Sequence, residues 1–179
     1  QRVASQAAMG ARRYQDFAVL YRMNAQSRNL EQALLQQRIP YKIVGGVRFY
    51  DRREVKDVLA YLRLLYQPRD TVSLSRIINV PKRGIGATSF ERFLMWQSLN
   101  NFDALEALSR ASEATDIAPR ARNALAELGE MLAKLQNQLM APNSNPADII
   151  EEIVTRTGYR EYVLDGSPQA EDRAANVEE

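Results

Sequence analysis

The chain has 179 residues, which is enough for one domain or for parts of two. It contains neither cysteine nor histidine, which excludes disulfides and thiolate metal sites and removes the commonest general base. No apolar run approaches the roughly 18 residues that a membrane span needs, and the first ten residues lack the apolar core of a signal peptide. Because the sequence does not begin with methionine, we expect it to be a piece of a longer protein.

The net charge of +2 hides a difference between the two halves of the chain. Residues 1–94 carry 17 basic and 7 acidic side chains, a net of +10, whereas residues 95–179 carry 7 and 15, a net of −8. The first half is therefore the candidate for binding a polyanion. Charges that segregate onto solvated faces without any function would give the same counts.

The first part of the chain is predicted to form a strand, a helix and a second strand, after a short helix that ends near Arg13. Asp16–Tyr21 is a continuous apolar run, which is typical of a buried strand. Ser27 is positioned to cap a helix whose apolar residues are Leu30, Ala33 and Leu34, with Leu35 beside them. Tyr41–Val44 is the second strand. This order predicts a small parallel α/β sheet.

Polar and aromatic side chains follow both predicted strands. Arg22 and Asn24 come after the first strand, and Arg48, Phe49 and Tyr50 come after the second. Ligands bind parallel sheets at this edge, and arginines with exposed rings suit a single DNA strand, because they contact phosphates and stack on bases. The same pattern also fits core aromatic residues beside solvated arginines.

The rest of the chain is predicted to be helical. Asp51 is positioned to cap the first of these helices, Gln67–Asp70 is a turn and the predicted domain boundary, and Gly129 costs the longest helix roughly 1 kcal/mol relative to alanine. The predicted helices cover Arg53–Tyr66, Val72–Ile78, Ser89–Leu99, Asp103–Ser109, Pro119–Leu139 and Pro146–Thr157. The predicted fold class is therefore α/β plus all-α, a strand–helix–strand portion followed by a mainly helical subdomain.

The segment Asn79–Gly86, between two of these helices, carries the clearest functional signal. Pro81 ends the preceding helix, because the residue before a proline avoids the α region. Thr88 and Glu91 have the spacing of a capping box for the following helix.

Two glycines and two cations in this segment together predict an anion site. Gly84 and Gly86 allow the backbone to approach a bulky group, and N–H groups at the start of a helix favour an anion. Lys82 and Arg83 add positive charge at the same place. We therefore predict a clamp for DNA backbone phosphates. An ordinary helix–helix turn has the same spacing, since a lone Gly-x-Gly is a weak signal.

Four segments resemble UvrD/PcrA/Rep-type DNA helicases in the family's order and spacing. They are Asp16–Arg28, Ile39–Gly46, Phe49–Asp57 and Ile78–Gly86, and Thr157–Arg160 resembles a later segment of the same region. The resemblance covers nearly the whole chain.

The resemblance implies a fragment of a 3′→5′ ATP-dependent translocase with two RecA-like motor domains, acting in DNA repair or replication in the bacterial cytoplasm, at the nucleoid. Residues 1–67 would belong to the second motor domain, 2A, and residues 68–179 to the helical insertion 2B, with a helix-hairpin-helix-like turn. The implied single-strand contacts are Arg22, Asn24 and Arg48. The implied duplex contacts are Lys82, Arg83, Gly84, Ile85, Gly86 and Thr88.

The implied partners are single-stranded DNA and the duplex junction, independent of sequence, together with repair or replication proteins. No Gly-x-x-x-x-Gly-Lys-Ser/Thr occurs, and no Asp-Glu pair of the Mg²⁺-binding kind is visible. We therefore expect no cofactor in this chain, with ATP and Mg²⁺ bound elsewhere in the parent protein, and no ATP hydrolysis by the chain alone.

Two other functions remain open from the residues. The acidic second half suits a regulatory or protein-interaction module that contacts a basic partner or the motor itself. A stand-alone enzyme is disfavoured, because no paired carboxylates stand out in a chain without histidine or cysteine.

Overall fold

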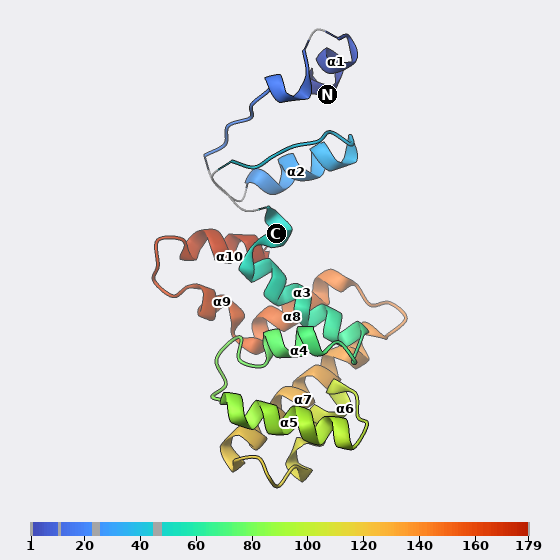
Figure 1. Cartoon of the computed structure of the whole chain (residues 1–179), viewed down its shortest axis with the longest axis vertical. Helices are drawn as coiled ribbons and strands as arrows, with labels where there is room; N and C mark the ends of the chain where they lie inside the picture. The colour runs from blue at the N-terminus through green and yellow to red at the C-terminus, as the bar shows by residue number, and fades with distance from the viewer. Residues whose placement is uncertain (1, 11, 23–25, 45–47, 179) are drawn as a thin grey trace.

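Helices make up the regular structure of this protein in the computed structural model, which describes residues 2–10, 12–22, 26–44 and 48–178. Figure 1 shows the two N-terminal helices at one end and a larger helical body at the other. The helices are α1 (Arg2–Ala8), α2 (Ser27–Gln36), α3 (Arg53–Tyr66), α4 (Thr71–Ile77), α5 (Ala87–Leu99), α6 (Ala104–Ser109), α7 (Pro119–Leu139), α8 (Pro146–Thr157), α9 (Tyr159–Val163) and α10 (Ala170–Glu178).

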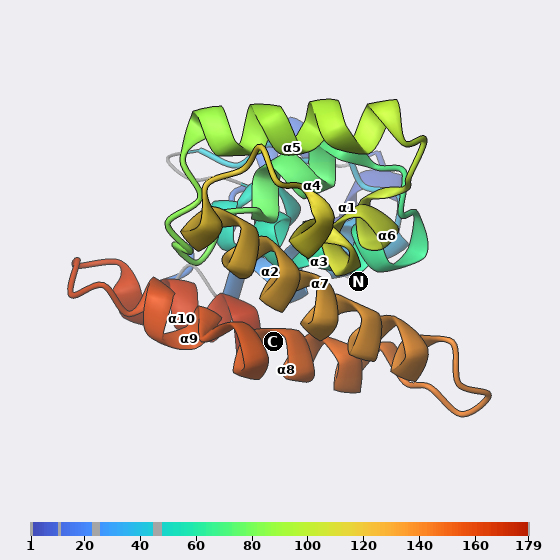
Figure 2. The same cartoon turned by 90° about the horizontal axis from the view of Figure 1, so that it is seen from below.

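One hydrophobic core holds α3 to α8 together. Its fully buried members include Tyr61 and Leu64 from α3, Phe93 from α5 and Leu108 from α6. Helix α7 crosses this core, as Figure 2 shows, and buries one face through leucines spaced three or four residues apart, namely Leu125, Leu128, Leu132, Leu135 and Leu139. The predicted apolar face of this helix is therefore confirmed.

Gly129 is the point at which α7 comes closest to α6. A Cβ atom built on Gly129 would lie only 2.4 Å from the backbone carbon of Leu108 and 2.6 Å from the Leu108 oxygen and the Ser109 nitrogen. Backbone atoms cannot swing aside as a flexible side chain can. The glycine that weakens the isolated helix is therefore what lets the two helices pack against each other.

Two predicted strands are wrong. Tyr14–Asp16 forms a 3-10 turn and residues 17–21 have no regular structure, with Leu20 95% exposed. Tyr41–Val44 is also irregular, and Val44 is 87% exposed. An extended segment becomes a strand only when another pairs with its backbone, and no described segment of this chain does so. The strand–helix–strand portion is thus absent from the described residues, and Gly45 and Gly46 lie outside them.

Two predicted helix caps are also wrong, although both helices exist. Ser27 is the first residue of α2 and not its cap, and its hydroxyl accepts a hydrogen bond of 2.6 Å from Nη2 of Arg52. Asp51 lies in a 3-10 turn (Phe49–Asp51) and pairs with Lys56 at 2.9 Å. By contrast, Asn145 caps α8 through the Ala147 N–H, and Gly158 ends α8 in the left-handed conformation, as predicted.

The turn at Gln67–Asp70 separates helices that share one core. Helix α3 precedes the turn, yet its Leu64 and Leu65 are buried in the same cluster as residues from α4 to α8. The Pro68 carbonyl accepts a hydrogen bond of 2.8 Å from the N–H of Ala104 at the start of α6. The domain boundary at this turn stays a prediction, and α3 packs as part of the helical body.

We expect Gly129→Ala to lower the free energy of unfolding by about 1–3 kcal/mol, because the added methyl group would push α7 away from the α6 backbone. The matched control is Asn123→Ala, an alanine introduced at an exposed position of the same helix, which should be neutral or slightly stabilising. Urea denaturation of both variants measures the difference. Equal stabilities would contradict the close-packing role of Gly129.

Candidate nucleic-acid interface

The candidate duplex site is the corner between α4 and α5, residues 78–88. Helix α4 ends at Ile77, and α5 begins at Ala87. Gly84 has a φ of +74°, in the left-handed region that favours glycine. The chain therefore turns sharply at Gly84 before it enters α5.

The side chain of Asn79 holds the corner from within. Its Oδ1 accepts hydrogen bonds from the backbone N–H groups of Arg83 (3.3 Å) and Ile85 (3.1 Å), and its Nδ2 donates to the Ile85 carbonyl at 2.5 Å. One side-chain amide thus pairs with both backbone groups of Ile85, as a neighbouring strand would. The N–H groups of Arg83 and Ile85 are therefore engaged inside the protein.

The Arg83 guanidinium is partly buried against the body of the protein. Its Nη1 donates to the carbonyls of Ile77 (2.8 Å), Ile78 (3.3 Å) and Pro81 (3.3 Å), and its Nη2 donates to the Tyr61 hydroxyl at 2.6 Å. The guanidinium also lies over the Tyr61 ring, 5.9 Å from its centroid. Arg83 satisfies the C-terminal carbonyls of α4, so its cationic head is committed to holding the corner.

Tyr61 connects this corner to α3. Its hydroxyl donates to the Val80 carbonyl at 2.5 Å while it accepts from Arg83. Burial raises the pKa of the Tyr61 hydroxyl above its usual value, and the neighbouring Arg83 charge acts in the opposite direction. The phenol therefore stays protonated at neutral pH and keeps its donor for Val80.

The remaining predicted duplex residues divide between the core and the outer side of the corner. Ile85 is buried, 3% exposed, and anchors the corner in the core, whereas Lys82, Gly84, Gly86 and Thr88 are exposed. No group of the described chain accepts a hydrogen bond from the N–H groups of Gly84, Gly86 or Thr88. These N–H groups are thus available to an anion.

The predicted capping box at Thr88 is wrong. Helix α5 begins two residues earlier than predicted, so Thr88 lies inside the first turn, and the residue at the cap position is Gly86, which has no side chain. A threonine at the second helical position cannot fold back on the N–H groups of its own turn as a cap does. No side chain of the described residues therefore caps the N–H groups in the first turn of α5.

The predicted single-strand residues lie in the N-terminal part. Arg22 and Arg48 are exposed, and the Arg48 guanidinium lies 5.8 Å from the centroid of the Tyr41 ring. No described hydrogen bond or ring contact joins the two arginines. Asn24 lies outside the described residues. The single-strand roles of these residues stay predictions.

The aromatic pair after Arg48 divides between the core and the surface. Phe49 is buried, 5% exposed, and its N–H donates to Glu31 at 3.2 Å. Tyr50 is 60% exposed and meets the edge of the Phe49 ring at a centroid distance of 5.2 Å. Phe49 is therefore a core residue, whereas Tyr50 keeps an exposed face on which a base could stack.

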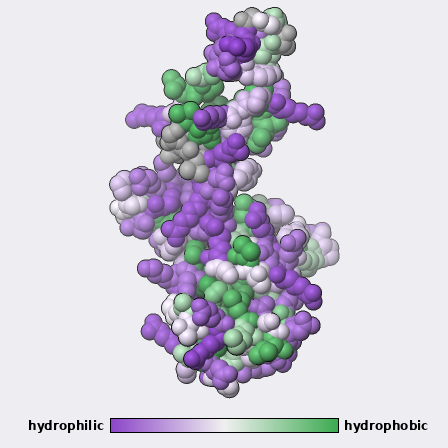
Figure 3. All heavy atoms as spheres, viewed as in Figure 1, coloured by the Kyte–Doolittle hydropathy of each residue, from purple (hydrophilic) through white to green (hydrophobic). Residues whose placement is uncertain are grey.

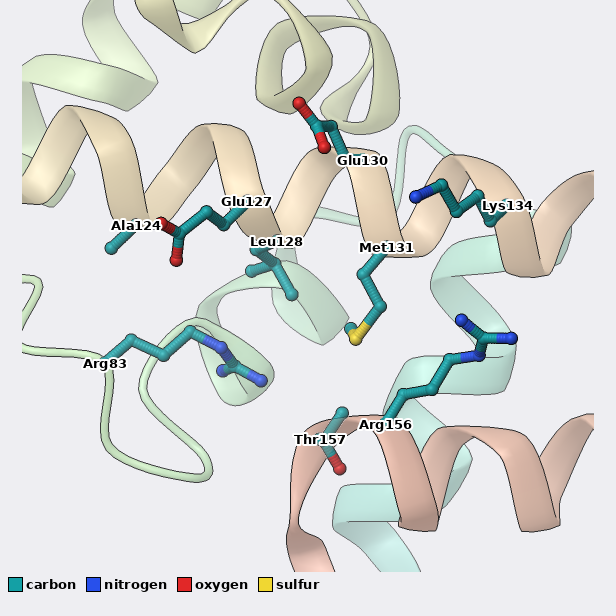
Figure 4. A pocket seen from close by; sticks show the side chains of 9 residues that line it. All are labelled: Arg83, Ala124, Glu127, Leu128, Glu130, Met131, Lys134, Arg156 and Thr157. Atoms are coloured by element: carbon teal, nitrogen blue, oxygen red, sulfur yellow. The ribbon is translucent and has the colours of Figure 1, made fainter.

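A groove of roughly 490 Å³ runs between the corner, α7 and α8. Figure 4 shows Arg83 entering it from the corner, with Thr157 and Arg156 on α8 and acidic and basic side chains along α7. Glu127 and Glu130 line the same groove as Lys134. Such mixed charge does not favour a polyanion, so the groove is not part of the candidate DNA surface.

Two of the segments that resemble the helicases, Phe49–Asp57 and Thr157–Arg160, contact each other through buried side chains. Asp57 is buried and accepts hydrogen bonds from Arg76 Nε (2.7 Å) and from the Tyr159 hydroxyl (2.8 Å). Burial, with the Asp57 charge as a second cause, raises the pKa of Tyr159 far above its usual value, so it remains a donor. The Phe49–Asp57 and Thr157–Arg160 segments are thus joined through one buried carboxylate.

Sequence reasoning missed Asn79 and Tyr61 as supports of the corner. Asn79 offered one signal, an amide six residues before Ile85 across a glycine turn, but Tyr61 offered none, since it lies on another helix. Neither a group of potential metal ligands nor a helix long and apolar enough to cross a membrane is found in the described part of the chain.

Residues 2–113 match the family described as UvrD-like helicase C-terminal domain. This match covers more than half of the chain. The chain belongs to this family. Within the UvrD-like match lie the corner and all the predicted single-strand residues, while α7 to α10 lie beyond it.

Individual UvrD-like relatives align over almost the whole chain. An ATP-dependent DNA helicase PcrA from Bacillus subtilis is 42% identical over 95% of the chain, and one from Leuconostoc citreum is 37% identical over 93%. A PcrA helicase from Staphylococcus aureus is 36% identical over 94%. The chain spans 23%, 22% and 23% of these relatives, about a quarter of their length.

We expect Arg83→Ala to lower the free energy of unfolding by about 2–3 kcal/mol, since hydrogen bonds to a charged group contribute about 1.5–3 kcal/mol. Lys82→Ala, one residue earlier and exposed, is the control and should stay within about 0.5 kcal/mol of the parent chain. Chemical denaturation followed by circular dichroism measures both. Equally small effects would show that the guanidinium does not hold the corner.

Proposed function

We propose that this chain is a DNA-contacting part of an ATP-dependent 3′→5′ DNA helicase that acts in repair or replication. The proposal is supported by the helicase relatives and by the UvrD-like match. The duplex would be held at the corner between α4 and α5, and the single strand at Arg22, Asn24 and Arg48. The parent protein would sit in the bacterial cytoplasm.

The observation that carries the duplex contact is the open outer side of the corner. Lys82 is exposed, and the N–H groups of Gly84, Gly86 and Thr88 have no acceptor among the described residues. Ammonium and N–H groups contact phosphates and do not read base edges, so binding would not depend on sequence. Arg83 would contribute by fixing the shape of the corner. The sequence predicts a direct phosphate contact for Arg83, but its guanidinium already donates to the Ile77 carbonyl and the Tyr61 hydroxyl, which does not favour that contact.

The single-strand contact would be made by residues of the N-terminal part. Arg22, Arg48 and the exposed ring of Tyr50 offer charge and a stacking face. The segments before Arg22 and Arg48 form no sheet in the described residues. The two arginines therefore do not lie at the sheet edge that the sequence predicted.

A regulatory or protein-interaction role has one observation in its favour. Apolar surface shows over α4 and α5 in Figure 3, and Val72, Met95 and Leu99 of these helices are 79%, 67% and 81% exposed. Exposed apolar groups of this kind occur at protein interfaces. If the chain fails to bind DNA and is captured by a protein through this face, this role replaces the DNA-contacting one.

We expect Lys82→Glu to weaken binding to a mixed-sequence DNA duplex about tenfold or more at 0.1 M salt, because it removes a phosphate contact and adds repulsion. Lys134→Glu makes the same charge change at an exposed position of α7 in the mixed-charge groove, outside the candidate DNA surface, and should have a much smaller effect. Fluorescence anisotropy with two unrelated duplexes measures both variants. Unchanged affinity of Lys82→Glu at low salt would remove the corner from the DNA interface.

We also expect the isolated chain to show no DNA-stimulated ATP hydrolysis, because its sequence holds no phosphate-binding loop. ATP and Mg²⁺ would be bound by other parts of the parent protein. A phosphate-release assay on the purified chain, with single-stranded DNA present, measures this. Turnover that rises with DNA and survives repeated purification would contradict the expectation.

A further inference from the structure

The first turn of α7 brings an arginine against the candidate duplex site. A Cβ atom built on Gly84 would lie 3.8 Å from both Nε and Nη2 of Arg120. Figure 2 shows the segment before α5 and the start of α7 at the same end of the helical body. The guanidinium of Arg120 therefore stands directly beside the turn that carries the open N–H groups.

The position of Arg120 is set by the packing of α7. Ala121 and Leu125, on the neighbouring face of the helix, are buried in the core. Arg92 of α5 donates from Nη1 to the Asp116 carbonyl at 2.8 Å, which ties α5 to the segment just before α7. The backbone that carries Arg120 is thus fixed relative to α5, while its side chain remains exposed.

Arg120 has no counter-ion in the described part of the chain. No ion pair or hydrogen bond joins its guanidinium to another described group, and α7 has no acidic residue in its first turn. A cation there faces the positive end of the helix dipole, which is unfavourable for α7 itself. A guanidinium can bind phosphate through two parallel N–H groups, so an anion bound at the corner would offset the unfavourable interaction between the Arg120 charge and the helix dipole.

We infer that Arg120 is a further phosphate-contacting residue of the duplex site, binding the same stretch of DNA backbone as Lys82 and the Gly84 N–H. The inference rests on the proposed function and extends it in two ways. It makes the site a composite of the α5 corner and α7, and it places a DNA contact in the acidic half of the chain. Arg120 also lies beyond the residues matched by the family, 2–113.

The absence of a side chain at Gly84 gives this arrangement its shape. Gly84 has a φ of +74°, and the described atoms within 4 Å of a Cβ placed on it belong to the Arg120 side chain. A phosphate seated there would meet donors from two separate segments of the chain. Such a contact fixes the direction of the DNA backbone better than a single flexible lysine does.

The test compares Arg120→Ala with Lys134→Ala in the 179-residue chain. Both remove one positive charge from an exposed position of α7, about 21 Å apart along the helix axis at 1.5 Å per residue. At 0.1 M salt we expect Arg120→Ala to bind a mixed-sequence duplex about eightfold more weakly and to reduce the slope of log K against log salt by about 0.9. Lys134→Ala should stay within about twofold of the parent, since bulk salt screens distant charges.

Arg120→Lys serves as the rescue variant. It keeps the charge, so it should restore most of the salt slope while it binds more weakly than the parent chain. Thermal unfolding of all variants should be unchanged within a few degrees. A weaker affinity that comes with a lower melting temperature and an unchanged salt slope would assign Arg120 a structural role and overturn the inference.

The remaining outcomes separate this inference from the function on which it rests. If Arg120→Ala behaves like Lys134→Ala while Lys82→Glu still weakens duplex binding, Arg120 is not a contact and the corner alone is the site. If neither Arg120→Ala nor Lys82→Glu changes affinity relative to its Lys134 control, the inference and the duplex-binding proposal both fail.

Discussion

The rest of the candidate site depends on the hydrogen bonds that hold the inner side of the α4–α5 corner. Arg83 closes the C-terminal carbonyls of α4 and reaches the Tyr61 hydroxyl on α3, while Asn79 pairs with the backbone of Ile85. The N–H groups of Arg83 and Ile85 are thereby engaged with Asn79. The N–H groups of Gly84, Gly86 and Thr88, which have no acceptor among the described residues, belong to exposed residues and so leave no buried unpaired group.

The two basic residues of the segment therefore have different roles. Lys82 and Arg83 are adjacent and carry the same charge, yet one is exposed and the other is committed to three carbonyls and a phenol. The arginine is suited to the inner position because its planar group can donate to several acceptors at once. A count of charges along the sequence cannot separate these roles, and it also assigned Arg120 to the acidic half, away from any polyanion.

The six helices predicted between residues 53 and 157 begin and end within two residues of their predicted bounds, and three of them, α3, α7 and α8, match those bounds. Their signals are local: a 3-4 apolar repeat, and proline near the start of α7 and α8. The sequence did not predict α9, and α1 ends at Ala8 and not near Arg13. The strands were not predictable, because Asp16–Tyr21 and Tyr41–Val44 have apolar residues but no pairing partner in the described residues. The caps at Ser27 and Thr88 failed because α2 begins one residue and α5 two residues earlier than predicted, which moves both side chains inside the helix. The cap at Asp51 failed although α3 begins where predicted, because Arg52 occupies the cap position and Asp51 lies in the preceding 3-10 turn.

The central claim is that the outward N–H groups of the corner bind duplex phosphates, and amide resonances report on it most directly. In a ¹⁵N-labelled chain titrated with a short mixed-sequence duplex, the account predicts that the N–H signals of Gly84, Gly86 and Thr88 shift in proportion to binding and return as salt is raised. The Arg83 and Ile85 signals, held by Asn79, should move less. Shifts confined to other surfaces, with the Gly84, Gly86 and Thr88 signals unmoved at saturation, would contradict the account.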